Sequence, residues 1–253
     1  MWTYEHLISY IPALAVMIAV ALLIRPRLIK LNEDKRRIPL FLIAIALVAL
    51  EFGKQVVSLS RGYNLFHIPL HYCSLFIVLV PLSAILRGKI ARAVTAATAA
   101  IGSALFLLMA IAPSLIYSKY SVLKMAEDFI GFHSVVYHML AVFSLILIFS
   151  LELHTPDIKH DFIPITVCVG AYSVAGGVFA QLLKTNFNNF YFCEVAEVDA
   201  IRLAMIDFIG YPLGQCIYVI LAMLVNVLFT HVAYLCYIGV WKILNRMSGK
   251  RKV

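Results

Sequence analysis

Long apolar runs separated by short, basic segments limit how this chain of 253 residues can fold. Most runs are about 20 residues long, which is the length that an α-helix needs to cross a bilayer core. Hydrophobic residues make up 63% of the chain and charged residues 13%, whereas an average soluble domain carries about 25% charged residues. The mean hydropathy is +0.94. We therefore predict an all-α, multi-pass protein of the cell membrane, with residues 1–253 in a single transmembrane bundle.

The runs predict about seven transmembrane spans. They lie at 7–24, 38–57, 66–86, 93–116, 129–151, 163–183 and 208–244. The last run is too long for one untilted span, and we expect one tilted helix there. Segment 184–207 is less hydrophobic, and its second half predicts an amphipathic helix at the membrane interface. Because segment 152–162 is only a weak loop signal, six or eight spans remain alternatives to seven.

The net charge of +8 comes from Lys and Arg residues that concentrate in the segments between the apolar runs. Six Lys and Arg residues fall between positions 25 and 37, and most others fall in alternate segments or near the C-terminus. Cytoplasmic segments carry such an excess, so we predict an outside N-terminus and a cytoplasmic C-terminus. No zinc-finger or RNA-binding motif accompanies the basic residues, and we expect no nucleic-acid partner.

In this topology, the polar residues within or beside the spans gather in the outer half of the membrane, and the inner halves are nearly featureless. Polar groups are costly in hydrocarbon and usually face a bundle interior or a wet cavity. We therefore expect one pocket that opens outward or into the outer leaflet. Its candidate members are Glu51, Lys54, His71, Cys73, His133, His138, Asn186, Asn189 and Gln215.

The pocket residues allow a thiol nucleophile with a histidine base. Cys73 would supply the thiolate, a histidine of run 129–151 would take its proton, and Lys54 would help to hold the negative charge. Glu51 and Lys54 are three residues apart, so a helix lets them pair. Histidines on two spans make a metal site conceivable, but Pro69 disrupts their helical spacing and no H-E-x-x-H motif exists. We predict neither a metal nor a cofactor.

Three segments carry a resemblance to a known family. They are LHYCSL at 70–75 after a proline, the histidine-bearing start of run 129–151, and TNFNNF at 185–190. Together they resemble the YwaF-type family of bacterial integral membrane proteins. That family is similar to a eukaryotic transmembrane acyltransferase that moves polyunsaturated acyl chains onto ether phospholipids with a cysteine and a histidine. It is more distantly similar to membrane hydrolases of fatty-acid esters that use threonine and histidine.

The resemblance implies the cysteine role for Cys73 and the histidine role for His138, with His133 as the second choice. Our first hypothesis is therefore a lipid acyltransferase or acyl-ester hydrolase whose substrate is a membrane lipid or acyl ester. Segment 186–189, or backbone N–H groups near Pro69, would stabilise the oxyanion.

The alternative is a binding or transport protein that holds a small solute or ion in the same pocket without catalysis. The lack of an internal repeat and the one-sided polar cluster argue against transport, because a pathway needs polar groups at both depths. Each polar residue alone also has a structural explanation, such as a hydrogen bond between helices, and a purely structural or assembly role stays open.

Overall fold

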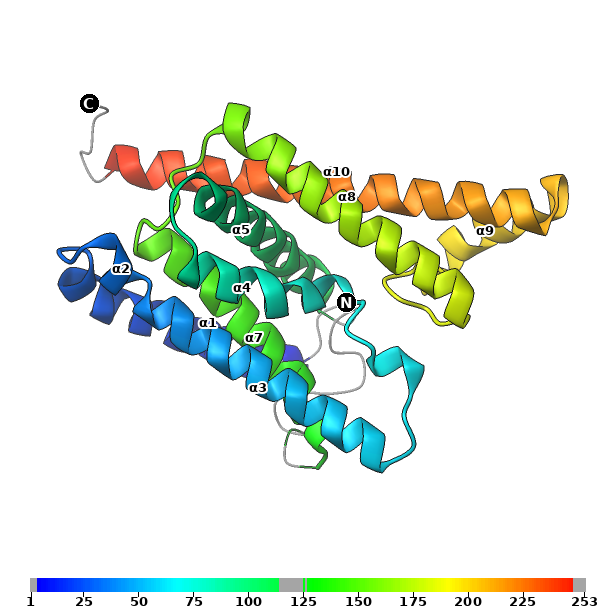
Figure 1. Ribbon diagram of the computed structural model, residues 1–253, viewed down its shortest axis with the longest axis horizontal. Coiled ribbons are helices and arrows are strands. Elements are labelled where there is room, and N and C mark those ends of the chain that lie inside the picture. Colours follow the sequence, from blue (N-terminus) through cyan, green and yellow to red (C-terminus); the bar gives the residue numbers. More distant parts are fainter. Residues whose placement is uncertain (1–3, 114–124, 126, 248–253) are drawn as a thin grey trace.

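The computed structural model of the protein describes residues 4–113, 125 and 127–247, and every regular element in these residues is a helix. Within the described part of the chain, six helices are long and apolar enough to cross a membrane. They are α1 (Tyr4–Leu28), α3 (Ile38–Ser60), α5 (Gly88–Ile111), α7 (Phe129–Ser150), α8 (Ile158–Leu183) and α10 (Tyr211–Met247). The short helices are α2 (Glu33–Arg36), η1 (Leu65–His67), η2 (Tyr72–Leu75), α4 (Phe76–Ile85) and α9 (Ala196–Ile209). Figure 1 shows their arrangement. The predicted all-α membrane bundle is confirmed.

Most predicted spans match a helix closely. The run at 93–116 begins five residues earlier than expected, as α5, and its positions 114–116 lie outside the described residues. The run at 208–244 forms one helix of 37 residues, as predicted, and at about 55 Å it is longer than a bilayer core of about 30 Å. This helix extends along the whole molecule in Figure 1. The amphipathic helix predicted before it is α9, which packs against α10.

The predicted span at 66–86 is wrong in its first half, because that half is not a continuous helix. The chain forms the 3₁₀ turn η1, then an extended stretch, and becomes α-helical only in α4. Pro69 explains the break, since it lacks an N–H group and disfavours helical geometry in the residue before it. Ile68 accordingly has φ −57° and ψ 134°. The candidate cysteine therefore lies in the short 3₁₀ helix η2, directly before α4.

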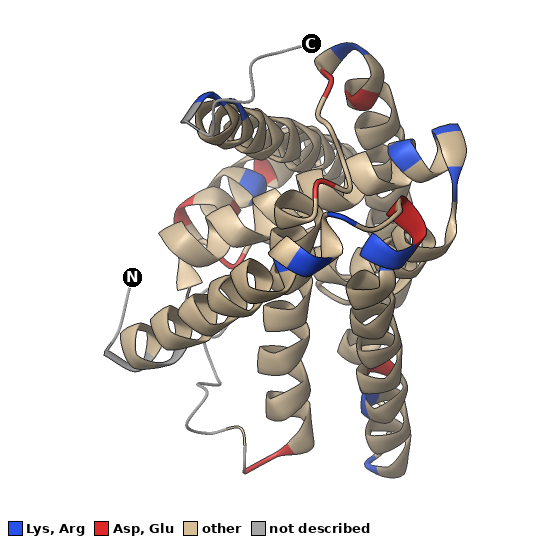
Figure 2. Ribbon diagram, turned by 90° about the vertical axis from the view of Figure 1, so that its left-hand side faces the viewer, with Lys and Arg blue, Asp and Glu red and all other residues tan. Residues whose placement is uncertain are grey.

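Contacts between helix ends divide the bundle into two faces. Three contacts join the end of α1 to the end of α7, the start of α3 to the end of α4, and the start of α5 to the start of α8: they are Arg25–Glu152, Arg37–Ser83 and Arg92–Asp161. Figure 2 looks onto this basic face. At the opposite end, Arg61 after α3 pairs with Asp128 before α7, at 2.7 Å. Among the described residues, the six long helices and the partly helical segment 65–85 run between these two faces, and a seventh crossing by that segment stays a prediction. Which face is cytoplasmic stays a prediction.

Helix α5 lies in the middle of the bundle, where it contacts α4, α7, α8 and α10. Its first half is rich in Ala, Thr and Gly, and small residues allow helices to approach closely in a membrane. At Gly102 an added Cβ would lie only 3.1 Å from the Cβ of Leu145 on α7. This close contact fixes the depth of α7, which carries two candidate histidines, relative to the rest of the bundle.

Candidate functional site

A buried charge cluster lies between α3 and α7. The Nζ atom of Lys54 is 2.7 Å from Oε1 of Glu51, and the two side chains are only 10% and 9% exposed. Nε2 of His133 lies 3.2 Å from the other carboxylate oxygen of Glu51. The prediction that Glu51 and Lys54 pair is confirmed. His133 contributes a third group to the pair, and such partners offset the cost of burying a charge.

Gln55 extends this cluster to the irregular segment before α4. Its side-chain amide donates to Oε1 of Glu51 at 2.7 Å and to the backbone carbonyl of His67 at 2.8 Å. Ser58 lies one turn further along α3, and its Oγ atom is 2.8 Å from Nδ1 of His67. Sequence reasoning missed Gln55 and Ser58. The spacing of Gln55 four residues after Glu51 was the signal that places both on one helix face.

Two tyrosines hold the backbone on either side of the candidate cysteine. Tyr137 on α7 donates to the carbonyl of Cys73 at 3.1 Å, and Tyr172 on α8 donates to the carbonyl of Leu70 at 2.7 Å. Irregular backbone is tolerated at membrane depth where the protein supplies such partners. The ring of Tyr137 also stacks on that of His133, with 5.1 Å between centroids. Nothing in the sequence singled out these two tyrosines.

The Cys73 side chain is half-buried and interacts electrostatically with Lys54 and Glu51. A close approach of the thiol to the ammonium group stays a prediction. The same cluster reaches Tyr137, whose electrostatic partners include Cys73. A direct contact between α7 and the cysteine is the hydrogen bond from Tyr137 to the Cys73 carbonyl, so these interactions bring α7 and η2 together.

His138 directly follows the tyrosine that contacts the backbone of Cys73. It interacts electrostatically with His71, His133 and Lys54. Its Nδ1 lies 2.6 Å from the carbonyl of Ser134. Because a carbonyl can only accept, Nδ1 must carry the proton, so in the neutral ring Nε2 is the basic nitrogen. A direct contact between the Cys73 sulfur and either histidine stays a prediction.

A family model described as the TMEM164 family matches residues 1–237. This chain belongs to the TMEM164 family. The match includes every candidate site residue and ends inside α10. It is consistent with the resemblance to a eukaryotic lipid acyltransferase, whereas the family that it names is not the YwaF-type family that the motifs suggested. Comparisons with curated proteins and with solved structures gave no match.

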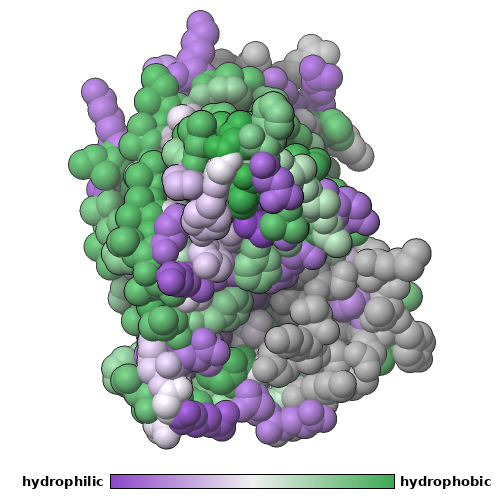
Figure 3. Space-filling view, turned by 90° about the vertical axis from the view of Figure 1, so that its right-hand side faces the viewer, coloured by the Kyte–Doolittle hydropathy of each residue, from purple (hydrophilic) through white to green (hydrophobic). Residues whose placement is uncertain are grey.

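In this TMEM164-family protein, the predicted amide ligands form a separate cluster around loop 184–195. Oδ1 of Asn186 accepts from the N–H groups of residues 191 and 192, and Oδ1 of Asn189 accepts from that of residue 194, each at 3.3 Å. Gln215 on α10 donates to the carbonyl of residue 191 at 2.9 Å. The rings of His71 and Phe187, 5.6 Å apart, link this cluster to the segment of Cys73. Figure 3 shows polar and apolar residues intermixed at this end of the molecule.

A second polar cluster lies near the basic face, so the expectation of featureless inner halves was wrong. Asp161 is 1% exposed, and its Oδ2 accepts from the hydroxyl of Tyr234 at 2.7 Å. Nε2 of His154 lies 3.2 Å from the same oxygen, and Nε of Arg92 lies 3.6 Å from Oδ1. Sequence reasoning placed Asp161 in a loop, whereas α8 begins at residue 158 and carries it into the bundle.

Proposed function

We propose that this TMEM164-family protein is a lipid acyltransferase or acyl-ester hydrolase that forms an acyl intermediate on Cys73. The observation that supports the proposal most is the hydrogen bond from Tyr137 to the Cys73 carbonyl, because it joins the thiol-bearing segment to the histidine-bearing turn of α7. The charged groups of Lys54 and Glu51 lie within electrostatic range of the thiol. The resemblance to a Cys/His acyltransferase supports the same chemistry.

In the proposed first step, a histidine takes the Cys73 proton as the sulfur attacks the ester carbonyl of a lipid. The carbon–sulfur bond forms, the carbon–oxygen bond breaks, and the imidazolium returns the proton to the departing alkoxide. In the second step, the histidine deprotonates an acceptor alcohol or water, which attacks the thioester. The carbon–sulfur bond then breaks and the proton returns to the thiolate. We assign the histidine role to His138, with His133 as the second choice.

The remaining candidates divide into groups that stabilise charge and groups that contact the headgroup. Lys54 would stabilise the thiolate, with Glu51 holding it in place. The headgroup contacts would come from His71, Gln215 and the amide NH₂ groups of Asn186 and Asn189, because loop 184–195 uses the Oδ1 oxygens of both asparagines. We propose a location in the cell membrane with the polar pocket on the outer side.

The runner-up function is binding or transport of a small solute or ion. The cluster around Asp161 favours it, because polar groups now occupy both halves of the bundle and the one-sided distribution no longer argues against a pathway. However, Oδ2 of Asp161 already accepts from Tyr234 and from the backbone N–H of Asp157. A carboxylate bonded in this way stabilises the fold more readily than it exchanges a passing solute.

Labelling with a fluorescent acyl-ester lipid tests the proposal. The purified protein should acquire a hydroxylamine-sensitive thioester, which Cys73→Ser and His138→Ala should abolish. Cys168→Ser is the matched control, because Cys168 is also half-buried but lies on α8, and it should keep the label. Thermal unfolding in detergent would verify that each variant is folded. Labelling that survives Cys73→Ser would end the acyl-enzyme proposal and leave solute binding as the better explanation.

A further inference from the structure

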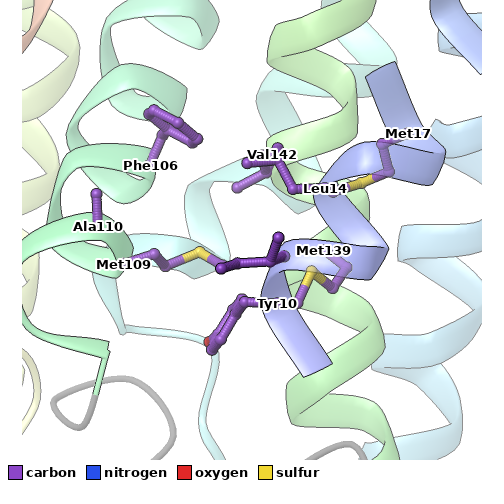
Figure 4. A pocket seen from close by; sticks show the side chains of 9 residues that line it. Tyr10, Leu14, Met17, Phe106, Met109, Ala110, Met139 and Val142 are labelled. Carbon is purple, nitrogen blue, oxygen red and sulfur yellow. The ribbon is translucent and has the colours of Figure 1, made fainter. Parts of the chain in front are cut away.

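An apolar cavity of about 170 Å³ lies between α1, α5 and α7. Figure 4 shows the side chains that converge on it. Its lining includes Ile11, Met17, Phe106, Met109, Met139 and Val142. Engineered apolar cavities of about 150 Å³ stay dry and bind apolar ligands such as benzene. A cavity of this size and lining therefore favours hydrocarbon over water or a polar solute.

The cavity opens toward the outside of the bundle. Two of its lining residues, Ile11 on α1 and Phe106 on α5, are 55% and 39% exposed. Both belong to helices that are apolar enough to cross a membrane, so the surroundings at this depth are lipid hydrocarbon. Three methionines on three different helices line the interior, and methionine side chains adapt to partners of different shape.

Helix α7 connects the cavity to the candidate site. Val142, which lines the cavity, follows His138 by four residues, so the two lie on one helix face about 6 Å apart along the axis. Helix α7 starts at the face where Arg61 pairs with Asp128 and runs toward the basic face. Because Met139, which directly follows His138, also lines the cavity, the cavity extends from about the depth of the proposed base to one turn beyond it.

We propose that this cavity binds a stretch of the acyl chain of a membrane lipid ester. The position of the ester, next to His138 and Cys73, rests on the proposed function. Binding of the chain rests on the cavity alone. The two inferences can fail separately, since an apolar chain can occupy the cavity even if no thioester forms.

A phosphatidylcholine with a diazirine in the middle of one acyl chain tests the site in nanodiscs of otherwise unlabelled phosphatidylcholine. After irradiation, we expect peptides that contain Met17, Met109 or Met139 to carry several-fold more label than peptides of α10 that contain the exposed residues Leu224 and Val225. An excess of unlabelled phosphatidylcholine with the same acyl chain should compete for the cavity label. Equal labelling of α10 and the cavity would mean ordinary contact with bulk lipid and would overturn the proposal.

A pair of substitutions gives the second measurement. Val142→Phe should fill the cavity and reduce the cavity label several-fold, whereas Val16→Phe on the exposed side of α1 should leave it unchanged. If Val142→Phe does not fold, labelling of the unmodified protein alone decides whether the cavity binds the acyl chain. In Cys73→Ser, cavity labelling should persist while thioester formation is lost. If the unmodified protein is labelled at the cavity but forms no thioester, the acyl-chain site stands and the proposed acyl-enzyme is rejected.

Discussion

The hydroxyl of Tyr137 donates a hydrogen bond to the backbone carbonyl of Cys73 at 3.1 Å. This bond joins α7 to the irregular stretch that replaces the first half of the third span. Because this stretch contains only short 3₁₀ turns and no α-helical ladder, its position depends on side-chain donors from neighbouring helices. The placement of Cys73 therefore depends on a residue 64 positions away in the chain.

Tyr137→Phe removes only the hydroxyl group. We expect the free energy of unfolding to fall by about 1 kcal/mol, which is typical of one lost hydrogen bond, and the rate of Cys73 acylation to fall as well. Thermal unfolding in detergent and the thioester assay measure the two effects. Tyr211→Phe, at an exposed position on α10, is the control and should change neither. Wild-type stability and acylation in Tyr137→Phe would show that the bond does not position the cysteine.

Glu51 and Lys54 form a buried pair, and a double-mutant cycle tests how strongly they depend on each other. Lys54→Met alone leaves a buried carboxylate without its ammonium partner. We expect this to lower the free energy of unfolding by about 3 kcal/mol. Combining it with Glu51→Gln should restore part of that loss. The exposed pair of Arg87 and Asp34 serves as the control, since such pairs contribute less than about 1 kcal/mol. Additive losses in the buried pair would contradict the coupling.

Asp161 should be the most sensitive residue of the inner cluster. Asp161→Asn replaces a buried carboxylate that accepts hydrogen bonds from Tyr234 and from the N–H of Asp157. We expect the free energy of unfolding to fall by about 2 kcal/mol, because at least one hydrogen bond to a charged group is broken. Asp157→Asn is the matched control, because it keeps a side chain that can cap α8 at a position that is only half-buried. Chemical unfolding in mixed micelles measures both. A larger loss for Asp157→Asn than for Asp161→Asn would reject the structural role of the cluster.

Acid should weaken the contact at the start of α7. The Arg61 guanidinium hydrogen-bonds Asp128 and lowers the pKa of that carboxyl below its ordinary value, and the N–H groups of residues 130 and 131 act in the same direction. A lowered folded-state pKa stabilises the protein above about pH 4, and the contribution is lost as the pH falls further. We expect Asp128→Asn to lose this part of the pH dependence when melting temperatures are compared between pH 3 and pH 6. An unchanged acid profile would contradict it.

Cysteine labelling tests the sidedness. In a Cys193→Ser background, Tyr63→Cys should react with an impermeant maleimide in intact cells, whereas Lys35→Cys should react only after the membrane is opened. Both positions are exposed, and they lie beyond opposite ends of α3, one before its start and one after its end. The reverse pattern would invert the predicted topology and move the candidate pocket to the cytoplasmic side.

The amino-acid sequence by itself determined the membrane class, the places of most helices and the pairing of Glu51 with Lys54. These follow from local rules, because hydropathy over about 20 residues decides what enters a bilayer and spacing along one helix decides what pairs. Asparagine and aspartate caps are local in the same sense, as Asp128 and Asp157 show at the starts of α7 and α8.

Only the tertiary structure decided that the third span unwinds and that Tyr137 and Tyr172 support it. Pro69 was visible in the sequence, but whether a freed carbonyl in a membrane finds a donor depends on helices that are distant in the chain. The cluster of Asp161, His154 and Tyr234 has the same origin, because its members come from a connection, α8 and α10. Hydrogen bonds between distant segments leave no periodic signal, so packing alone reveals them.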